Sequence, residues 1–281
     1  MRKDWHRKEQ ENTLEEGKRR IVLSVSYDGM LFNGWQAQED KSAVQDKVEE
    51  AILNCTGEKV HLFASGRTDS GVHALSQTCS FDTSSTIPAE RIKYAINAHL
   101  PEGVKIMESH EADGFFHARF SSLAREYRYY LKERDNCTVF DENRVWGIKG
   151  MSDIDLLNAL AKMLLGERDF AFLSLKEDEG KSTFRDIYKS EFYKSGDYTV
   201  YRIVGNAFLY HQVRSIVGTI IKVALKEKDI QKAKASFDAI INQKKRSNAI
   251  FTAPPYGLYF YRTVYSEEEW KELSKDIENH D

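Results

Sequence analysis

The stretch Ile21-Val22-Leu23-Ser24-Val25-Ser26-Tyr27, followed by Asp28-Gly29, decides the kind of fold that this chain forms. β-Branched and other apolar residues continue for the length of one strand and stop at a turn signal, which predicts a strand over 21–27. A helix is predicted next, with Ser42 as its N-cap and Gln45 as the capping-box partner. Its apolar residues recur at helical spacing: Val44, Val48, Ala51, Ile52 and Cys55. The chain therefore opens with a strand and a helix.

The same alternation continues to the C-terminus. The first half adds strands at 59–65 and 73–82, a helix after Pro88 and a strand near 104–107. The second half has strands at 122–132, 186–193, 198–204 and 259–265, and helices at 153–165, 209–225 and 229–241. This order predicts an α+β fold of two split βαβ halves, ferredoxin-like or RRM-like, with mainly antiparallel sheets flanked by helices and an active-site cleft between them. We assign residues 1–19 to a flexible charged extension, 20–112 to an N-terminal domain and 113–281 to a C-terminal domain.

Composition narrows the class of protein. No run approaches the roughly 20 apolar residues that a membrane crossing needs, and the N-terminus lacks the apolar run of a secretory signal, so we expect a cytoplasmic protein. The three cysteines are scattered, which favours neither a disulfide framework nor a zinc site. The formal net charge of −3 does not by itself indicate a nucleic-acid partner.

The segment Gly66-Arg67-Thr68-Asp69-Ser70-Gly71-Val72-His73-Ala74 contains the candidate catalytic residue. In an extended backbone, residues i and i+2 face the same way, so we expect Arg67 to hold the Asp69 carboxylate while Ser70 and Gly71 turn the chain. An ordinary Asx-type turn with a solvated ion pair is the alternative. Asp-Ser-Gly also matches the tripeptide of aspartic proteases, but such enzymes use two carboxylates, and here the tripeptide occurs once and follows the charged Arg67.

Aromatic and cationic residues alternate along the strand that starts at residue 122. Period two places Arg125, Tyr127 and Tyr129 on one face and Glu126, Arg128 and Tyr130 on the other, so both faces combine aromatic rings with cations. With Arg119 and Arg134, this surface is suited to holding phosphates and stacking an unpaired base. Solvated arginines on an aromatic strand are the alternative. Lys244-Lys245-Arg246 is a weaker basic patch, and such a run more often marks only a helix end or a loop.

A second candidate group lies at the start of the helix predicted over 209–225. His211 and Arg214 are one turn apart and could face the same phosphate or carboxylate. No pair of histidines has metal-ligand spacing, so we expect no metal. The glycine-rich nucleotide loops and the serine-hydrolase elbow do not occur either.

Taken together, the motifs resemble those of the tRNA pseudouridine synthase A family over about residues 20–266. The matching segments are Tyr27-Asp28-Gly29, Gly34-Trp35-Gln36-Ala37-Gln38, Gly66 to Ala74, Phe116-His117-Ala118-Arg119-Phe120-Ser121, Arg125 with Tyr127 and Tyr129, Asp169-Phe170, the Arg185 segment, Asn206-Ala207-Phe208 with His211 and Val213-Arg214, Ala253-Pro254, and Gly257-Leu258-Tyr259. Asn33 and Gln212 depart from residues that are common in the family.

The resemblance implies isomerisation of uridine to pseudouridine in tRNA, in the anticodon arm around positions 38 to 40, without a cofactor. It places the catalytic aspartate at Asp69, its arginine partner at Arg67 and the active-site tyrosine at Tyr127. It further implies that Leu258 contacts the base, that Arg214 lies near the site, and that the protein is a homodimer that binds tRNA. A non-catalytic RNA-binding or tRNA-folding module on the same fold is the alternative function.

Overall fold

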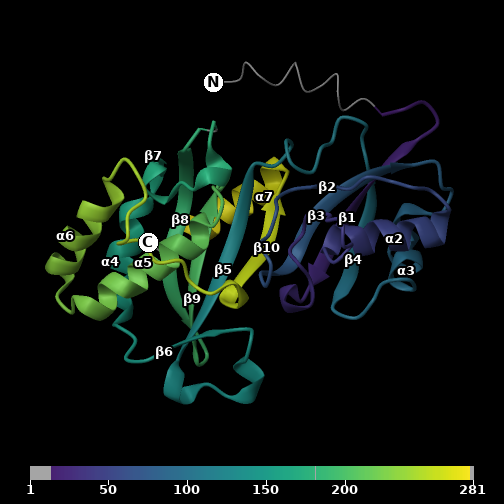
Figure 1. The fold of residues 1–281 in the computed structure, drawn as a ribbon. Helices are drawn as coiled ribbons and strands as arrows, with labels where there is room; N and C mark the ends of the chain where they lie inside the picture. The colour runs from purple at the N-terminus through teal and green to yellow at the C-terminus, as the bar shows by residue number, and fades with distance from the viewer. Residues whose placement is uncertain (1–13, 181, 279–281) are drawn as a thin grey trace. The chain divides into compact units, whose positions relative to one another are not determined.

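The computed structural model describes residues 14–180 and 182–278 and divides them into two compact units (Figure 1). The N-terminal unit comprises residues 14–122 and Phe260–Tyr265, and the C-terminal unit comprises Leu123–Tyr259 and residues 266–278. Most of the charged extension predicted at 1–19 therefore lies outside the described residues, and regular structure begins with β1 at Arg19. The units divide after Ser122, whereas the sequence placed a domain boundary after residue 112.

The N-terminal unit is an antiparallel sheet with two helices. Its elements are β1 (Arg19–Tyr27), α2 (Val44–Thr56), β2 (Phe63–Ala64), β3 (His73–Thr83), α3 (Ala89–Asn97) and β4 (Val104–Ala112). The strand β1 lies between β4 and β3, and it is antiparallel to both. The short β2 pairs with β3 on the other side. From Leu23 to Tyr27, buried residues of β1 alternate with half-buried serines, whereas Arg20, Ile21 and Val22 before them are all buried.

The start of α2 differs from the prediction. The N-cap is Ala43 rather than Ser42, and the side chain that caps it is Asp46, whose Oδ2 accepts from the Ala43 N–H at 3.2 Å. Ser42 instead donates through its hydroxyl to Asp40, in the preceding turn. The predicted N-cap, Ser42, lies one residue before the observed one, because short polar side chains find hydrogen-bond partners in the loop as well as in the helix.

The strands of the C-terminal unit pair with one another mostly in the antiparallel sense. They are β5 (Ala124–Glu133), β6 (Trp146–Ile148), β7 (Gly166–Asp169), β8 (Phe184–Ser195) and β9 (Tyr198–Gly205). Antiparallel pairing runs from β5 to β9, β8 and β7, whereas β6 pairs with β5 in parallel. The last strand, β10 (Leu258–Val264), contributes its first two residues to this unit and Phe260–Val264 to the N-terminal unit.

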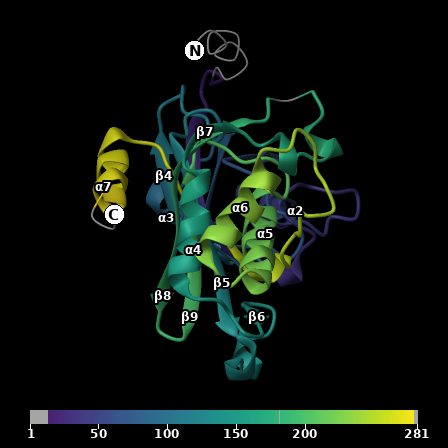
Figure 2. The ribbon, with the colours of Figure 1, turned by 90° about the vertical axis from the view of Figure 1, so that its left-hand side faces the viewer.

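Helices cover both faces of the strands in the C-terminal unit. The helices α4 (Ile154–Ala161), α5 (Gln212–Lys226) and α6 (Ile230–Ile241) pack against one another. In Figure 2, α5 and α6 lie on one side of β8 and β9, and α7 (Glu267–Glu278) lies on the other. Trp270 of α7 meets Tyr188 of β8 edge-on, with 4.9 Å between the ring centroids. The mixed α+β class and the mainly antiparallel sheets flanked by helices are as the sequence predicted.

Several boundaries differ from the prediction. The strand expected over 59–65 is reduced to Phe63–Ala64, and the helix expected from residue 209 begins at Gln212. The helix expected over 153–165 ends at Ala161 and continues as one turn of 3-10 helix. The strands β6 and β7 and the helix α7 were not predicted. The two strands are short, whereas the apolar residues Trp270, Leu273 and Ile277 of α7 do recur at helical spacing and could have indicated this helix.

Candidate active site

Asp69 lies on a tight turn between β2 and β3 of the N-terminal unit. The backbone N–H of Val72 donates to the carbonyl of Asp69 at 3.1 Å, and Gly71 adopts a φ of +81°. A positive φ at the third residue is typical of a type II turn, where glycine is not strained. Thr68 is buried, Asp69 is half-buried and Ser70 is exposed. The turn therefore presents the carboxylate at the border between the core and the solvent.

Two glycines from the segment before α2 allow main chain to pack directly against this turn. A Cβ atom on Gly34 would lie 2.7 Å from the carbonyl oxygen of Thr68, and one on Gly29 would lie 2.0 Å from that of Val72. Both distances are shorter than any real Cβ contact, so only glycine fits. The carbonyl of Gly29 also accepts from the N–H of Gly71 at 3.1 Å. The Asp69 turn is thus held by backbone on both sides.

Hydrogen bonds connect this arrangement to the start of α2. The N–H of Trp35 donates to the carbonyl of Thr68 at 3.1 Å. The N–H groups of Val44 and Gln45 donate to the carbonyls of Gly34 and Trp35, at 3.1 and 3.0 Å. The first N–H groups of a helix have no partner within the helix, so the loop satisfies them while the helix orders the loop. The position of Asp69 therefore depends on α2.

Two buried side chains fix the residues around Asp69. The hydroxyls of Tyr27 and Thr68 are 2.7 Å apart. His73 accepts the backbone N–H of Gly29 at Nδ1, at 3.1 Å, and this same nitrogen lies 3.2 Å from Oδ1 of Asp28. Tyr27 and His73 belong to the sequence motifs, but no role for either residue was predicted.

Arg67 does not hold the Asp69 carboxylate as predicted. Its side chain is exposed, and within the described residues no hydrogen bond or ion pair joins it to Asp69. The prediction assumed an extended backbone, but β2 ends at Ala64 and residues 66–69 form a loop. The alternation of side chains along a strand therefore does not apply here.

Tyr127 lies in the C-terminal unit, on β5. Its side chain is 8% exposed and meets the ring of Phe208 edge-on, with 5.2 Å between centroids. Phe208 follows Gly205, the last residue of β9, so the two neighbouring strands together form this aromatic corner. An edge-to-face pair fixes the plane of the tyrosine ring. Tyr127 is thereby given one orientation.

Leu258 follows a segment that runs close to β5. The hydroxyl of Tyr129 donates to the carbonyl of Pro254 at 2.7 Å, and a Cβ atom on Gly257 would lie 2.6 Å from the Tyr129 ring. Tyr129 is completely buried, which raises the pKa of its hydroxyl well above the ordinary value. It therefore acts as a neutral hydrogen-bond donor. Leu258, 5% exposed, begins β10 directly after this contact.

Further bonds fasten the same segment, residues 246–258, to α5. Arg214 is bonded to Ala253 twice, since its Nε donates to the carbonyl at 2.9 Å and its own carbonyl accepts the Ala253 N–H at 3.0 Å. Arg246 donates to the carbonyl of Leu173 at 3.0 Å and to Oγ1 of Thr252 at 2.7 Å. Arg246, which the sequence assigned to a basic surface patch, is thus half-buried and structural, and its burial lowers the pKa of its guanidinium.

His211 is the N-cap of α5 and has a left-handed backbone, with φ of +58°. Its ring stacks on that of Tyr210, with 3.9 Å between centroids. Gln212 closes the turn by accepting the Leu209 N–H at Oε1, at 2.7 Å. His211 and Arg214 therefore belong to the first turn of one helix, as predicted from their spacing.

The other predicted phosphate-binding arginines differ in their surroundings. Arg119, in the N-terminal unit, is exposed and lies over the ring of Phe120, with 5.7 Å from the guanidinium carbon to the ring centroid. Arg125, in the C-terminal unit, is 9% exposed and donates to the carbonyl of Asn206 at 2.6 Å. Arg125 orders the loop after β9, whereas Arg119 presents its side chain to the solvent.

The second face of β5 is a network of ion pairs. Glu126 is fully buried and lies 2.9 Å from Arg128 and 3.0 Å from Arg202. Arg202 also lies 3.8 Å from Glu191, which pairs with Lys189 at 3.2 Å. The charges of these arginines are compensated inside the protein, so this face is less suited to phosphates than the face of Arg125 and Tyr127.

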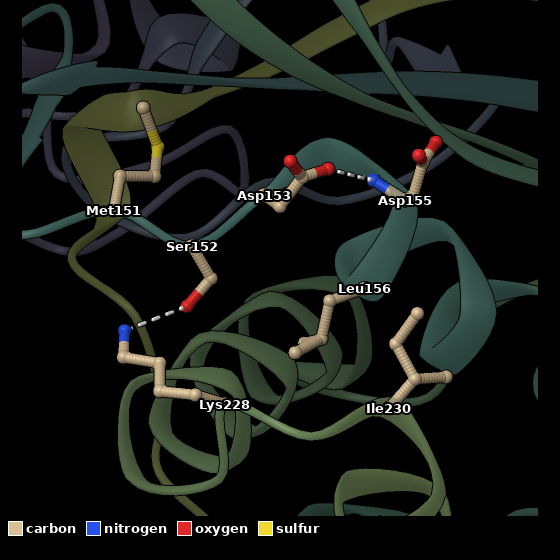
Figure 3. A pocket seen from close by; sticks show the side chains of 7 residues that line it. All are labelled: Met151, Ser152, Asp153, Asp155, Leu156, Lys228 and Ile230. Atoms are coloured by element: carbon tan, nitrogen blue, oxygen red, sulfur yellow. Dashed lines mark hydrogen bonds between the residues drawn. The ribbon is translucent and has the colours of Figure 1, made fainter.

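A cavity of about 510 Å³ opens in the C-terminal unit, where α4 begins beside the segment between α5 and α6 (Figure 3). None of the predicted site residues lines it. Its Lys228 donates to Oγ of Ser152 at 3.2 Å, and its Asp153 caps α4 by accepting the N–H of Asp155 at 2.8 Å. Its polar groups thus have structural partners.

Within residues 14–180 and 182–278, no three histidine, cysteine, aspartate or glutamate side chains gather closely enough to hold a metal ion. None of the helices in this part of the chain combines the length and apolar character of a membrane crossing.

Comparison with known proteins identifies the family to which this chain belongs. A model of the tRNA pseudouridine synthase family matches residues 23–121 and 160–266, leaving Tyr127 between the two matched segments. The tRNA pseudouridine synthase A of Bacillus subtilis is 37% identical over 248 residues, which cover 88% of this chain and 99% of that protein. That of Borreliella burgdorferi strain B31 is 36% identical over the same shares. An archaeal chain from the box H/ACA sRNP Nop10-Cbf5 complex has a TM-score of 0.37 at 12% identity over 88% of this chain and 50% of its own, too low to define the fold.

These findings make the protein an RNA-modifying isomerase, a pseudouridine synthase. Within that class, the chain belongs to the tRNA pseudouridine synthase A family, whose members it matches over nearly their whole length.

Proposed function

We propose that this pseudouridine synthase isomerises uridines in the anticodon arm of tRNA, around positions 38 to 40, with Asp69 as the catalytic carboxylate. The supporting observation is the turn that carries Asp69, which is clamped by the backbone at Gly29 and Gly34 and places a half-buried carboxylate at the surface. A catalytic group must be held rigidly relative to the reacting atoms, and this turn has little freedom to move.

The reaction exchanges one bond of the uridine for another. The bond from N1 to the ribose C1′ breaks, the uracil rotates, and C5 bonds to C1′. C5 then loses its proton and N1 gains one, so the reaction is balanced without a cofactor. An ionised Asp69 can serve as the nucleophile at C1′ or can stabilise the positive charge that develops on the sugar.

The other site residues act on the substrate in this proposal. A uridine inside folded tRNA must leave its stack, which costs a few kcal/mol, and Tyr127 and Leu258 offset that cost by holding the displaced base. Arg67 is exposed near Asp69 and contacts the target nucleotide, whereas Arg214 and His211 bind phosphates beside it.

The finer description of the fold belongs to the same proposal. The order β4-β1-β3-β2 in the N-terminal unit is that of a split βαβ sheet. In the C-terminal unit, β5, β9 and β8 are neighbours in the order that the first, third and second strands of a split βαβ sheet have. We propose that the two halves form the active-site cleft between them, and that a cytoplasmic homodimer binds the tRNA. A dimer would combine the basic surfaces of two subunits, although each has a net charge of −3.

The experiment compares Asp69→Ala and Asp69→Asn with the wild-type protein on unmodified tRNA. Pseudouridine is mapped by carbodiimide-dependent stops in reverse transcription, and affinity is measured by filter binding. Both variants are expected to bind tRNA normally and to form no pseudouridine. Asp135→Ala, at an exposed carboxylate of the C-terminal unit, is the control and should remain fully active.

The same assay separates the alternatives. Product formed by Asp69→Ala at near the wild-type rate would remove Asp69 from the catalytic role. A wild-type protein that binds tRNA but modifies none would instead support the non-catalytic RNA-binding module. Stops at positions outside the anticodon arm would support the pseudouridine synthase activity but show that the modified uridines lie elsewhere in the tRNA.

A further inference from the structure

Four aromatic rings form a continuous row on the N-terminal unit. The centroid distances are 5.0 Å from His61 to Phe63, 5.2 Å from Phe63 to His117 and 4.4 Å from His117 to Phe120. The guanidinium of Arg119 lies over the last ring. These five residues, which we call the aromatic row, come from two segments about 55 positions apart in the sequence.

The aromatic row is accessible at both ends. Phe63 is 43% exposed, the side chain of His61 is 63% exposed, and Arg119 is exposed. A single exposed phenylalanine is common on protein surfaces, but a row of rings that ends in a cation is not a scattered residue of that kind.

The rings are held in place before any ligand binds. Phe63 is fixed by the pairing of β2 with β3, opposite Ser80. Next to it, the Leu62 N–H donates to Oε1 of Glu49 at 2.9 Å, and this oxygen lies 3.5 Å from Nδ1 of His61. The ring of His117 accepts the N–H of Arg119 at 3.0 Å. A surface that is already ordered loses little entropy on binding.

We propose that the aromatic row binds unstacked bases of the substrate tRNA, at nucleotides other than the target uridine. This inference rests on the proposed function for the identity of the substrate. Proteins recognise single-stranded RNA by stacking its bases on aromatic rings and by placing cations beside its phosphates. The row offers the exposed rings of His61 and Phe63 for stacking, and the guanidinium of Arg119 matches the charge of the backbone.

The composition of the row favours RNA over a protein partner. Two of its four rings are imidazoles, which stack on bases and also form polar contacts with water or phosphate. The core of a protein interface is more apolar and is depleted of charge, and an exposed and a half-exposed imidazole beside an arginine do not fit that description.

The test measures RNA binding apart from catalysis. We expect Phe63→Ala to raise the Kd for unmodified tRNA about tenfold, as expected for the loss of one stacking contact, with KM rising equally and kcat unchanged. Phe63→Tyr should bind as the wild type does, because it keeps the ring. Phe63→Leu should bind as weakly as Phe63→Ala, because it keeps only the apolar volume. A single-stranded oligoribonucleotide without uridine should show the same order of affinities.

The matched control is Tyr94→Ala. Tyr94 is also an aromatic residue of the N-terminal unit, is 67% exposed and has a lysine, Lys93, 5.2 Å from its ring centroid. Among the described residues no other ring packs against it, so its removal should leave RNA affinity unchanged.

Three results would overturn the proposal. They are an unchanged Kd in Phe63→Ala, full recovery in Phe63→Leu, and an altered oligomeric state of Phe63→Ala in light scattering, which would indicate a protein contact. The uridine-free oligonucleotide distinguishes a failure of this binding proposal from a failure of the proposed function. If the wild type makes no pseudouridine but the oligonucleotide binds in the expected order, only the proposed function fails.

Discussion

The hydroxyl oxygen of Tyr27 lies 2.7 Å from Oγ1 of Thr68, the residue immediately before Asp69. Both side chains are buried, at 4% and 8% exposure, and they join β1 to the turn that carries the candidate catalytic carboxylate. In a buried site, a polar group that loses its only partner keeps the full cost of desolvation. This pair therefore connects the stability of the sheet with the geometry of Asp69.

We expect Tyr27→Phe to lower kcat by about three- to thirtyfold and stability by about 1 kcal/mol, because the Thr68 hydroxyl loses a buried partner next to Asp69. Single-turnover pseudouridine formation and urea denaturation measure the two effects. KM should change little, since Tyr27 is buried. Thr68→Ser keeps the hydroxyl and is the control. The pair would have no such role if Tyr27→Phe and Thr68→Val had fully additive effects in a double-mutant cycle.

Gly34→Ala should nearly abolish activity while the protein stays folded. The new methyl group would lie 2.7 Å from the Thr68 carbonyl, so the Asp69 turn must move away from its present position. The control is Gly57→Ala at the end of α2. Gly57 has almost the same backbone angle, φ +75° against +77°, but no atom lies within 4 Å of its Cβ position.

Circular dichroism and thermal unfolding establish that both glycine variants fold, and pseudouridine formation then separates them. Gly57→Ala should be destabilised only by placing an alanine in the left-handed backbone region, which costs about 1 to 2 kcal/mol, and it should remain active. If both variants lose activity equally, backbone strain explains the result and the close contact with Thr68 does not.

The sequence predicted the elements of the fold better than the contacts of the site. Long apolar strands and helices such as β1, β3 and α5 have strong periodicity, and they were placed to within a few residues. The contact between Arg67 and Asp69 was inferred from strand geometry, and it fails because the backbone leaves the strand at Ala64. Local dihedral angles in a loop depend on the partners of that loop, which here come from residues 27–35.

The clamp around Asp69 illustrates why those partners could not be found from periodicity. Gly29 and Gly34 are required by the close approach of main chain that is distant in sequence, and a glycine carries no side chain that reveals its neighbour. Arg246 shows the same limit in a run of charges. Lys244, Lys245 and Arg246 are equivalent in the sequence, but only the two lysines are exposed. Burial of one member of a charge run is decided by tertiary packing.

Arg246→Met should destabilise the protein by about 1 to 3 kcal/mol, because the carbonyl of Leu173 and the hydroxyl of Thr252 lose their donor. The segment that leads to Leu258 should then loosen, and kcat should fall while tRNA affinity changes little. Lys245→Met, at the exposed neighbour, should stay within 0.5 kcal/mol of the wild type, as is usual for surface changes.

Denaturant unfolding and filter binding test this prediction. If Arg246 served mainly as a phosphate contact, Arg246→Met would raise the Kd for tRNA and flatten its dependence on salt without lowering stability. That pattern would contradict the structural role.

Asp141 should make stability depend on pH at the acidic end. The backbone N–H of Thr138 donates to its carboxylate at 2.7 Å, followed by Lys132 at 3.1 Å and the Tyr198 hydroxyl at 2.9 Å, and these contacts lower its pKa to about 2. A carboxyl whose pKa is lower in the folded protein stabilises it fully above the ordinary pKa near 3.8, and this contribution is lost as the pH falls towards 2.

Asp141→Asn should therefore be less stable at pH 7, by about 1 to 3 kcal/mol, and should lose less stability than the wild type between pH 4.5 and 2.5. Asp197→Asn is the control, because Asp197 lies 4.0 Å from the same Lys132 but its side chain is 85% exposed. Urea denaturation across this pH range gives the slopes, and an Asp141→Asn slope equal to that of the wild type would show that the ionised carboxylate does not produce the acid sensitivity.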